Sequence, residues 1–123
     1  MTHEPPDPLA DLQERLANTE DTARPDAVAK RHSRGGRTAR ENLADLTEDA
    51  SVFEYGQLAV AAQRQRRGGD ALFAETAADA VITAVGLVNS ALFSESAART
   101  ALIINDYTVL AGTQGYFHHR KID

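Results

Sequence analysis

The stretch from Ala80 to Gly115 constrains the fold most, because it is the most apolar part of the chain. Two apolar runs within it, Ala80–Leu87 and Thr100–Ala111, flank a polar connection. Their branched and bulky side chains suit a pleated sheet, so both runs are predicted to be strands. Since nearly every position is apolar, the sheet is predicted to be covered on both faces. Leu92 and Phe93 in the connection are predicted to be buried anchors.

The segment before this stretch is predicted to be largely helical. A first helix is expected over Pro8–Asn18, where leucines at spacings of three and four share one face. A second begins at Pro25, because proline fits a first helical turn, and ends at Gly35-Gly36. Thr38 and Glu41 have the spacing of a capping box and predict a third helix. Two further segments complete the outline. The alternating Val52–Tyr55 is predicted to be a short strand, and Tyr116–Asp123 is predicted to be the start of a helix.

Composition excludes several classes of protein. The 123 residues fit one small domain or part of a larger one, and the sequence contains no cysteine. Disulfides, thiolate metal sites and a cysteine nucleophile are therefore excluded. A net charge of −5 argues against nucleic-acid binding. The N-terminus is rich in acids and prolines and no apolar run reaches the ~18 residues of a membrane span. A cytoplasmic location and a disordered Met1–Pro8 are expected.

The second apolar run ends in Gly112-Thr113-Gln114-Gly115, and two interpretations of this turn stay open. Its free N–H groups could face a phosphate, a thioester oxygen or an acyl group. It could equally be a plain corner between a strand and a helix, in which glycines supply conformational freedom. The residues match neither the P-loop nor the dinucleotide-binding pattern.

Two groups of basic residues are candidate phosphate contacts. One is a ladder at a spacing of three, and the other lies in a glycine-rich turn; the members are Arg31, Arg34, Arg37 and Arg40, then Arg64, Arg66 and Arg67. Either group could meet a nucleotide-bearing ligand, or form a solvated face or subunit contact. His118 and His119 are neighbours on a predicted helix and point about 100° apart, so no metal site is predicted. No residue is predicted to be catalytic.

The order of these segments resembles the N-terminal part of the carboxyltransferase component of biotin-dependent acyl-CoA carboxylases, the acetyl-, propionyl- and methylcrotonyl-CoA carboxylase family. The resemblance covers about Ala23 to Asp123. The segments that carry it are Arg37–Leu43, Ser51–Gly56, Asp79–Asn89 and Asn105–Gly115, followed by His119, Lys121 and Asp123.

This resemblance implies an α/β (α+β) fold, here an incomplete crotonase-like arrangement of ββα units, with 1–23 as tail and first helix and 24–123 as the carboxyltransferase segment. It implies carboxyl transfer from carboxybiotin to the α-carbon of an acyl-CoA. Biotin would be carried by a partner domain, and none is bound by this chain alone. The implied partners are acyl-CoA, the rest of the carboxyltransferase, the biotin carrier and biotin carboxylase subunits, and further copies in a homo-oligomer.

The same resemblance implies site residues. Gly112, Thr113, Gln114 and Gly115 correspond to the turn near the acyl-CoA in crotonase-like folds. Arg37 and Arg40 are expected at a CoA phosphate or at a subunit contact. Relatives also have a later Gly-Gly-Ala-Arg-type segment and a second domain, which this sequence lacks, so a truncated copy is expected. It would act as an enzyme only with the remainder supplied; alternatively it is a non-catalytic remnant that binds CoA or a subunit.

Overall fold

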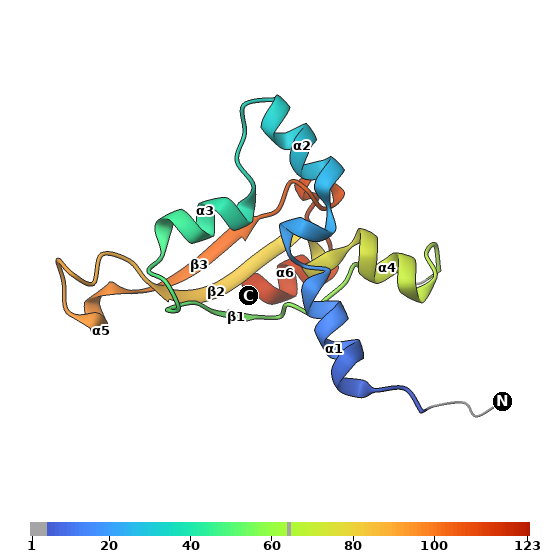
Figure 1. Ribbon diagram of the computed structural model, residues 1–123, viewed down its shortest axis with the longest axis horizontal. Coiled ribbons are helices and arrows are strands. Elements are labelled where there is room, and N and C mark those ends of the chain that lie inside the picture. The colour runs from blue at the N-terminus through green and yellow to red at the C-terminus, as the bar shows by residue number, and fades with distance from the viewer. Residues whose placement is uncertain (1–4, 64) are drawn as a thin grey trace.

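The computed structural model describes residues 5–63 and 65–123, and Figure 1 shows a small twisted sheet with helices around it. The α-helices are α1 Pro8–Ala17, α2 Pro25–Ser33, α3 Ala39–Leu46, α4 Gly69–Glu75, α5 Glu95–Ala98 and α6 Tyr116–Ile122. The strands are β1 Phe53–Tyr55, β2 Val81–Leu87 and β3 Arg99–Asn105. Three short 3₁₀ helices lie at Asp21–Ala23 (η1), Ala77–Ala80 (η2) and Leu110–Gly112 (η3).

The three strands form one antiparallel sheet in the order β1-β2-β3. Glu54 lies opposite Ala84, which lies opposite Leu102, and this register fixes which side chains share a face. The two predicted strands do pair, and the first is confirmed over 81–87. The second was predicted to extend to Ala111, and this is wrong because β3 ends at Asn105. Asp106 ends it, because its carboxylate accepts hydrogen bonds from the Thr108 amide (2.9 Å) and hydroxyl (2.6 Å) in an Asx turn.

One face of the sheet, named here the covered face, packs against α3. Ala39 and Leu43 of α3 lie over Ile82, Ala84 and Leu102 in one buried cluster. The capping box that starts α3 is confirmed: the Glu41 amide donates to Thr38 Oγ1 (3.1 Å) and the Thr38 amide donates to Glu41 Oε2 (2.8 Å). Figure 1 shows α3 running along the sheet above β3. This helix is therefore the main cover of that face.

The opposite face, named here the open face, exposes apolar side chains of the outer strands. Phe53, Tyr55, Ala101 and Ile103 belong to it by register, and Ile103 is 53% exposed. The prediction that both faces of the sheet are buried is confirmed for β2. It is wrong for β3, where exposed residues alternate with more buried ones. The predicted anchors Leu92 and Phe93 are also wrong, since they are 76% and 59% exposed.

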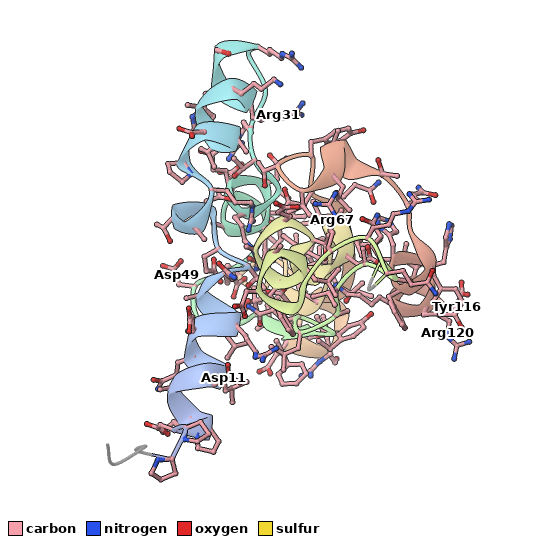
Figure 2. All side chains as sticks on the ribbon, turned by 90° about the vertical axis from the view of Figure 1, so that its right-hand side faces the viewer. Asp11, Arg31, Asp49, Arg67, Tyr116 and Arg120 are labelled. Carbon is pink, nitrogen blue, oxygen red and sulfur yellow. The ribbon has the colours of Figure 1, made fainter. Side chains whose placement is uncertain are left out.

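Helices α1 and α2 begin and end within one residue of the predicted bounds. Proline lies in the first turn of both α1 and α2, and Ser94 caps α5 through the Ala97 amide. Figure 2 shows α1 and α2 at opposite ends of one side of the molecule. Of the disorder predicted for Met1–Pro8, residues 1–4 lie outside the described residues, and the prediction is wrong at Pro8, which begins α1 after Asp7 caps it. Among the described residues, no helix has the length and apolar character needed to cross a membrane.

Arg24 ties the connection between α1 and α2 to the turn after β3. Its guanidinium donates to the carbonyls of Asn18 and Thr19, and to the Thr108 hydroxyl. It also faces the buried Asp106 carboxylate at 3.4 Å, with only 10% of the arginine side chain exposed. One cation thus joins the helical segment to the sheet across more than 80 residues, which local sequence patterns could not indicate.

Candidate functional site

The turn Gly112–Gly115 joins η3 to α6. The amides of Gly112 and Thr113 are already used, because they donate to the carbonyls of Val109 (2.9 Å) and Leu110 (3.1 Å). The amides of Gln114 and Gly115 have no acceptor among the described residues. Thr113 and Gln114 are exposed. The turn therefore offers two backbone donors at the surface.

Both glycines of this turn also have a packing role. Gly112 has a φ of +73°, and a Cβ there would approach the Tyr107 ring to 3.1 Å. A Cβ on Gly115 would lie 3.1 Å from a carboxylate oxygen of Asp79. A larger side chain would disturb a neighbour at either position, so the glycines are needed whether or not a ligand binds.

Asp79 and His118 form a fully buried polar pair beneath the turn. Asp79 Oδ2 accepts from the His118 amide (2.8 Å), and the Asp79 carbonyl accepts from His118 Nδ1 (2.9 Å). Asp79 Oδ1 and His118 Nε2 have no partner among the described residues. The contacts between Asp79 and His118 join residues 39 positions apart. The sequence pattern, in which His118 stands out only as the neighbour of His119, therefore could not indicate them. Within the described chain no cluster of three histidine or acidic residues could hold a metal.

The backbone around Asp79 is left-handed over three consecutive residues, Ala78, Asp79 and Ala80, with φ of 53°, 47° and 61°. This is the conformation that favours glycine. Ala78 and Ala80 therefore keep a turn that their side chains do not favour.

Lys121 of α6 contacts the backbone on both sides of Asp79. Its Nζ donates to the carbonyls of Ala78 (2.8 Å) and Val81. Burial lowers the pKa of Lys121 to about 8, although the nearby carboxylates of Glu54 and Asp79 act in the opposite direction. The lysine thus joins α6 to the start of β2. Its role as a helix anchor was not evident from the sequence.

Arg37 and Arg40, both predicted to contact a CoA phosphate or a subunit, lie in different surroundings. Arg40 is 88% buried in its side chain and faces Glu54 with both terminal nitrogens, while its Nε donates to the Thr19 carbonyl (3.2 Å). Burial disfavours its charge, but hydrogen bonding and attraction from Glu54 outweigh burial and raise the pKa of Arg40. Its donors are therefore committed to the protein. It lines an open groove of about 610 Å³ beside α3 and β1.

Arg37 lies at a different place, closer to the glycine turn. Its guanidinium donates to Asp45 (3.1 Å) and to the Glu41 carbonyl (3.1 Å) and is half exposed. It lines a cavity of about 80 Å³ with Arg31 and Tyr107. Because a Cβ built on Gly112 would lie 3.1 Å from the Tyr107 ring, the cavity and the turn are neighbours. In the second basic group Arg67 pairs with Glu75, and Arg64 lies outside the described residues.

Comparison with known proteins gives a consistent result. No family model matches the chain. A biotin-dependent long-chain acyl-coenzyme A carboxylase beta4 subunit from Mycobacterium tuberculosis strain H37Rv is 31% identical over 99% of this chain and 20% of its own length. A single-chain, multi-domain long-chain acyl-CoA carboxylase structure superposes with a TM-score of 0.88 at 50% identity, over 94% of this chain and 12% of that one.

A second solved structure is more distant. The transcarboxylase 12S hexamer, with methylmalonyl-CoA and methylmalonic acid bound, superposes with a TM-score of 0.64 at 26% identity over 93% of this chain and 19% of that chain. The chain spans a fifth or less of the length of each of these three relatives. Its mixed fold of helices and a small antiparallel sheet is the one found in these structures. The chain is therefore similar, over nearly all of its length, to one segment of the carboxyltransferase components of biotin-dependent acyl-CoA carboxylases.

Proposed function

We propose that this chain supplies one wall of an acyl-CoA carboxyltransferase site and acts only together with the rest of that fold, whether joined to it or supplied as a separate polypeptide. The observation that carries the proposal is the superposition over 94% of this chain but 12% of the matched carboxylase. The reaction would move a carboxyl group from carboxybiotin to the α-carbon of an acyl-CoA. Such a reaction needs donors on the thioester oxygen as the enolate forms.

The turn Gly112–Gly115 is the part of the chain proposed to lie beside the acyl-CoA. The free amides of Gln114 and Gly115 support this, because backbone donors can bind a phosphate or a carbonyl oxygen. Two amides at an exposed turn do not make a complete oxyanion site by themselves. The remaining donors would come from the rest of the carboxyltransferase.

We propose that biotin reaches the site on a partner carrier. The larger cavities among the described residues are open grooves, and one of them is lined by Phe117 of α6 with Gln63 and Arg66. Biotin would supply the carboxyl group when its carrier docks.

The open face and the β3 edge are the proposed contact with the remaining carboxyltransferase. Phe53, Tyr55 and Ile103 present exposed apolar side chains on the two outer strands of this face, and exposed apolar surface of this kind marks interaction sites. β3 is an edge strand whose outer backbone groups can pair with a further strand. A partner that adds a strand and covers this face would complete the sheet.

A non-catalytic role is the second candidate, favoured by one observation. The predicted site residues have structural duties among the described residues: Gly112 and Gly115 fit against neighbours, and Arg40 is held by Glu54. On this alternative the chain binds CoA or a subunit without turnover.

The test is a carboxylation assay with a carboxybiotin donor and acyl-CoA, with and without a polypeptide that carries the rest of a related carboxyltransferase. The chain alone is expected to be inactive and the mixture active. Ile103→Asp on the open face should abolish this restoration, whereas Leu9→Asp, at an exposed leucine of α1, should not. Turnover by the chain alone would overturn the proposal. A mixture that forms a complex but stays inactive would favour the non-catalytic role.

A further inference from the structure

The small cavity between α2, α3 and the turn after β3 has the composition of an anion site. Its volume is about 80 Å³, enough for two or three waters or one tetrahedral oxyanion, taking about 30 Å³ for a water. Its lining contains no carboxylate: the residues are Arg31, Arg37, Thr38, Ala39, Asn42, Asn105, Tyr107 and Thr108.

Arg31 is held in place before any ligand arrives. Its Nε donates to the Arg37 carbonyl (2.9 Å), and its guanidinium carbon lies 4.9 Å from the centre of the Tyr107 ring. Gly36 makes room for this position, because a Cβ there would lie 2.6 Å from Arg31 Cζ. The side chain therefore loses little rotamer freedom on binding, which favours affinity. Figure 2 labels Arg31 on α2.

The terminal nitrogens of Arg31 are the free donors of the cavity. Neither donates to an acceptor among the described residues, and within this part of the chain Arg31 forms no ion pair. Thr38 and Thr108 already donate their hydroxyls to Asp21 and Asp106. The Asn42 and Asn105 amides are further donors of the right kind.

Three carboxylates near the cavity face basic side chains: Asp45 pairs with Arg37, Glu41 lies 2.7 Å from His32 Nε2, and the buried Asp106 faces Arg24. The Asp21 carboxylate accepts the Thr38 hydroxyl and forms no ion pair among the described residues. Of the two arginines that line the cavity, Arg37 is paired with Asp45 and Arg31 is without an ion pair within the described part of the chain. A planar guanidinium with two free nitrogens matches a phosphate in bidentate geometry.

We propose that this cavity binds a phosphate monoester, with the Arg31 guanidinium as its anchor. Resting on the proposed function, the ligand group is the 3′-phosphate of coenzyme A. The Tyr107 ring next to Arg31 also lies beside Gly112, where an added Cβ would approach it to 3.1 Å, so a ligand held here by its phosphate lies near the turn proposed for the acyl-CoA.

The test is calorimetric titration of the full chain at low salt with inorganic phosphate, CoA and 3′-dephospho-CoA. CoA is expected to bind about tenfold more tightly than dephospho-CoA, the effect of one charge-assisted hydrogen-bonded pair. Arg31→Gln should remove that difference. Arg34→Gln is the matched control, because it removes the same charge from an exposed arginine of the same segment that does not line the cavity. Circular dichroism verifies the fold of each variant.

Gly36→Ala separates position from charge. It keeps every charge but displaces the Arg31 guanidinium, so it should weaken CoA binding by severalfold while leaving dephospho-CoA unchanged. The comparison of the two ligands on the unaltered chain needs no variant at all. It therefore tests the proposal even if Arg31→Gln does not fold.

The outcomes separate the two proposals. Equal affinity for CoA and dephospho-CoA, or equal losses in Arg31→Gln and Arg34→Gln, overturns the phosphate site and leaves the carboxyltransferase proposal standing. Arg31-dependent binding of inorganic phosphate without binding of CoA supports the cavity as a phosphate site and removes coenzyme A as its ligand. A folded chain that binds none of the three ligands overturns the inference.

Discussion

The two faces of the sheet differ although the same three strands build them. On the covered face Ile82, Ala84 and Leu102 are buried under α3. On the open face Ile103, the next residue of β3, is 53% exposed, and Phe53 and Tyr55 of β1 are 71% and 41% exposed. Apolar side chains point to both faces of the sheet. The difference in burial therefore depends on which face a helix covers. A sheet completed on one side is expected of a segment of a larger fold.

The largest expected effect comes from a matched pair of substitutions on the two faces. Ile82→Ala should lower the free energy of unfolding by about 2–5 kcal/mol, because Ile82 is 1% exposed and its loss leaves a cavity. Ile103→Ala should change it by about 0.5 kcal/mol or less, since water already reaches that side chain. Urea denaturation followed by circular dichroism measures both. Similar losses at the two positions would show that the open face is covered in solution.

The ion pair at the rim of the covered face is expected to have the next largest effect. Glu54→Gln should cost about 2–3 kcal/mol, because it leaves the buried Arg40 charge without its partner. Glu20→Gln is the control, since Glu20 lies 3.8 Å from Arg40 and is half exposed, and it should cost less than about 0.5 kcal/mol. Urea midpoints of the two variants make the comparison. Equal midpoints would contradict a structural role for the Arg40–Glu54 pair.

Lys121, which holds α6 at the start of β2, should make stability depend on pH. Its pKa is about 8 in the folded chain and 10.5 when unperturbed, so between these values the unfolded state binds more protons. The free energy of unfolding should therefore rise with pH from about 8 to 10.5, by about 1–2 kcal/mol once solvent screening is allowed for. Below pH 8 both states are protonated and this contribution does not change.

Denaturation of the unaltered chain and Lys121→Met across this pH window isolates the lysine. The rise should be smaller in the variant by the amount given above. Identical pH profiles would mean that Lys121 is solvated and does not anchor α6.

The smallest expected effect is at the start of the helix that covers the sheet. Thr38→Ala removes the side-chain cap of α3 and should cost about 1 kcal/mol. Thr38→Ser keeps the hydroxyl and should restore most of that loss. Thermal unfolding compares the three proteins, and an alanine variant as stable as the parent would show that packing alone holds α3 on the covered face.

Local patterns in the sequence predicted the elements whose causes are local. Pro25 at the start of α2 and the Thr38–Glu41 capping box mark helix starts by their own hydrogen-bonding and conformational preferences. The strand at 81–87 follows from its branched residues. The end of β3 at Asn105 was missed because the Asx turn of Asp106 interrupts an apolar run whose composition continues to Ala111.

The site depended more on contacts between distant residues. The sequence singled out Gly112–Gly115 and the arginine ladder by residue type. It could not distinguish Arg40, held by Glu54, from Arg31, whose terminal nitrogens are free in a cavity without carboxylates. Nor could it indicate the buried Asp79–His118 pair or the contacts of Lys121. These relationships join residues from about 14 to more than 40 positions apart.

The sequence by itself determined the helices at the N-terminus, the apolar strand pair and the resemblance to carboxyltransferases, because local preferences and the order of segments are properties of the chain alone. Only the tertiary structure decided which face of the sheet is covered, where β3 ends and which arginine is available to a ligand. Burial and charge pairing depend on which distant residues meet in space, and that is decided by packing.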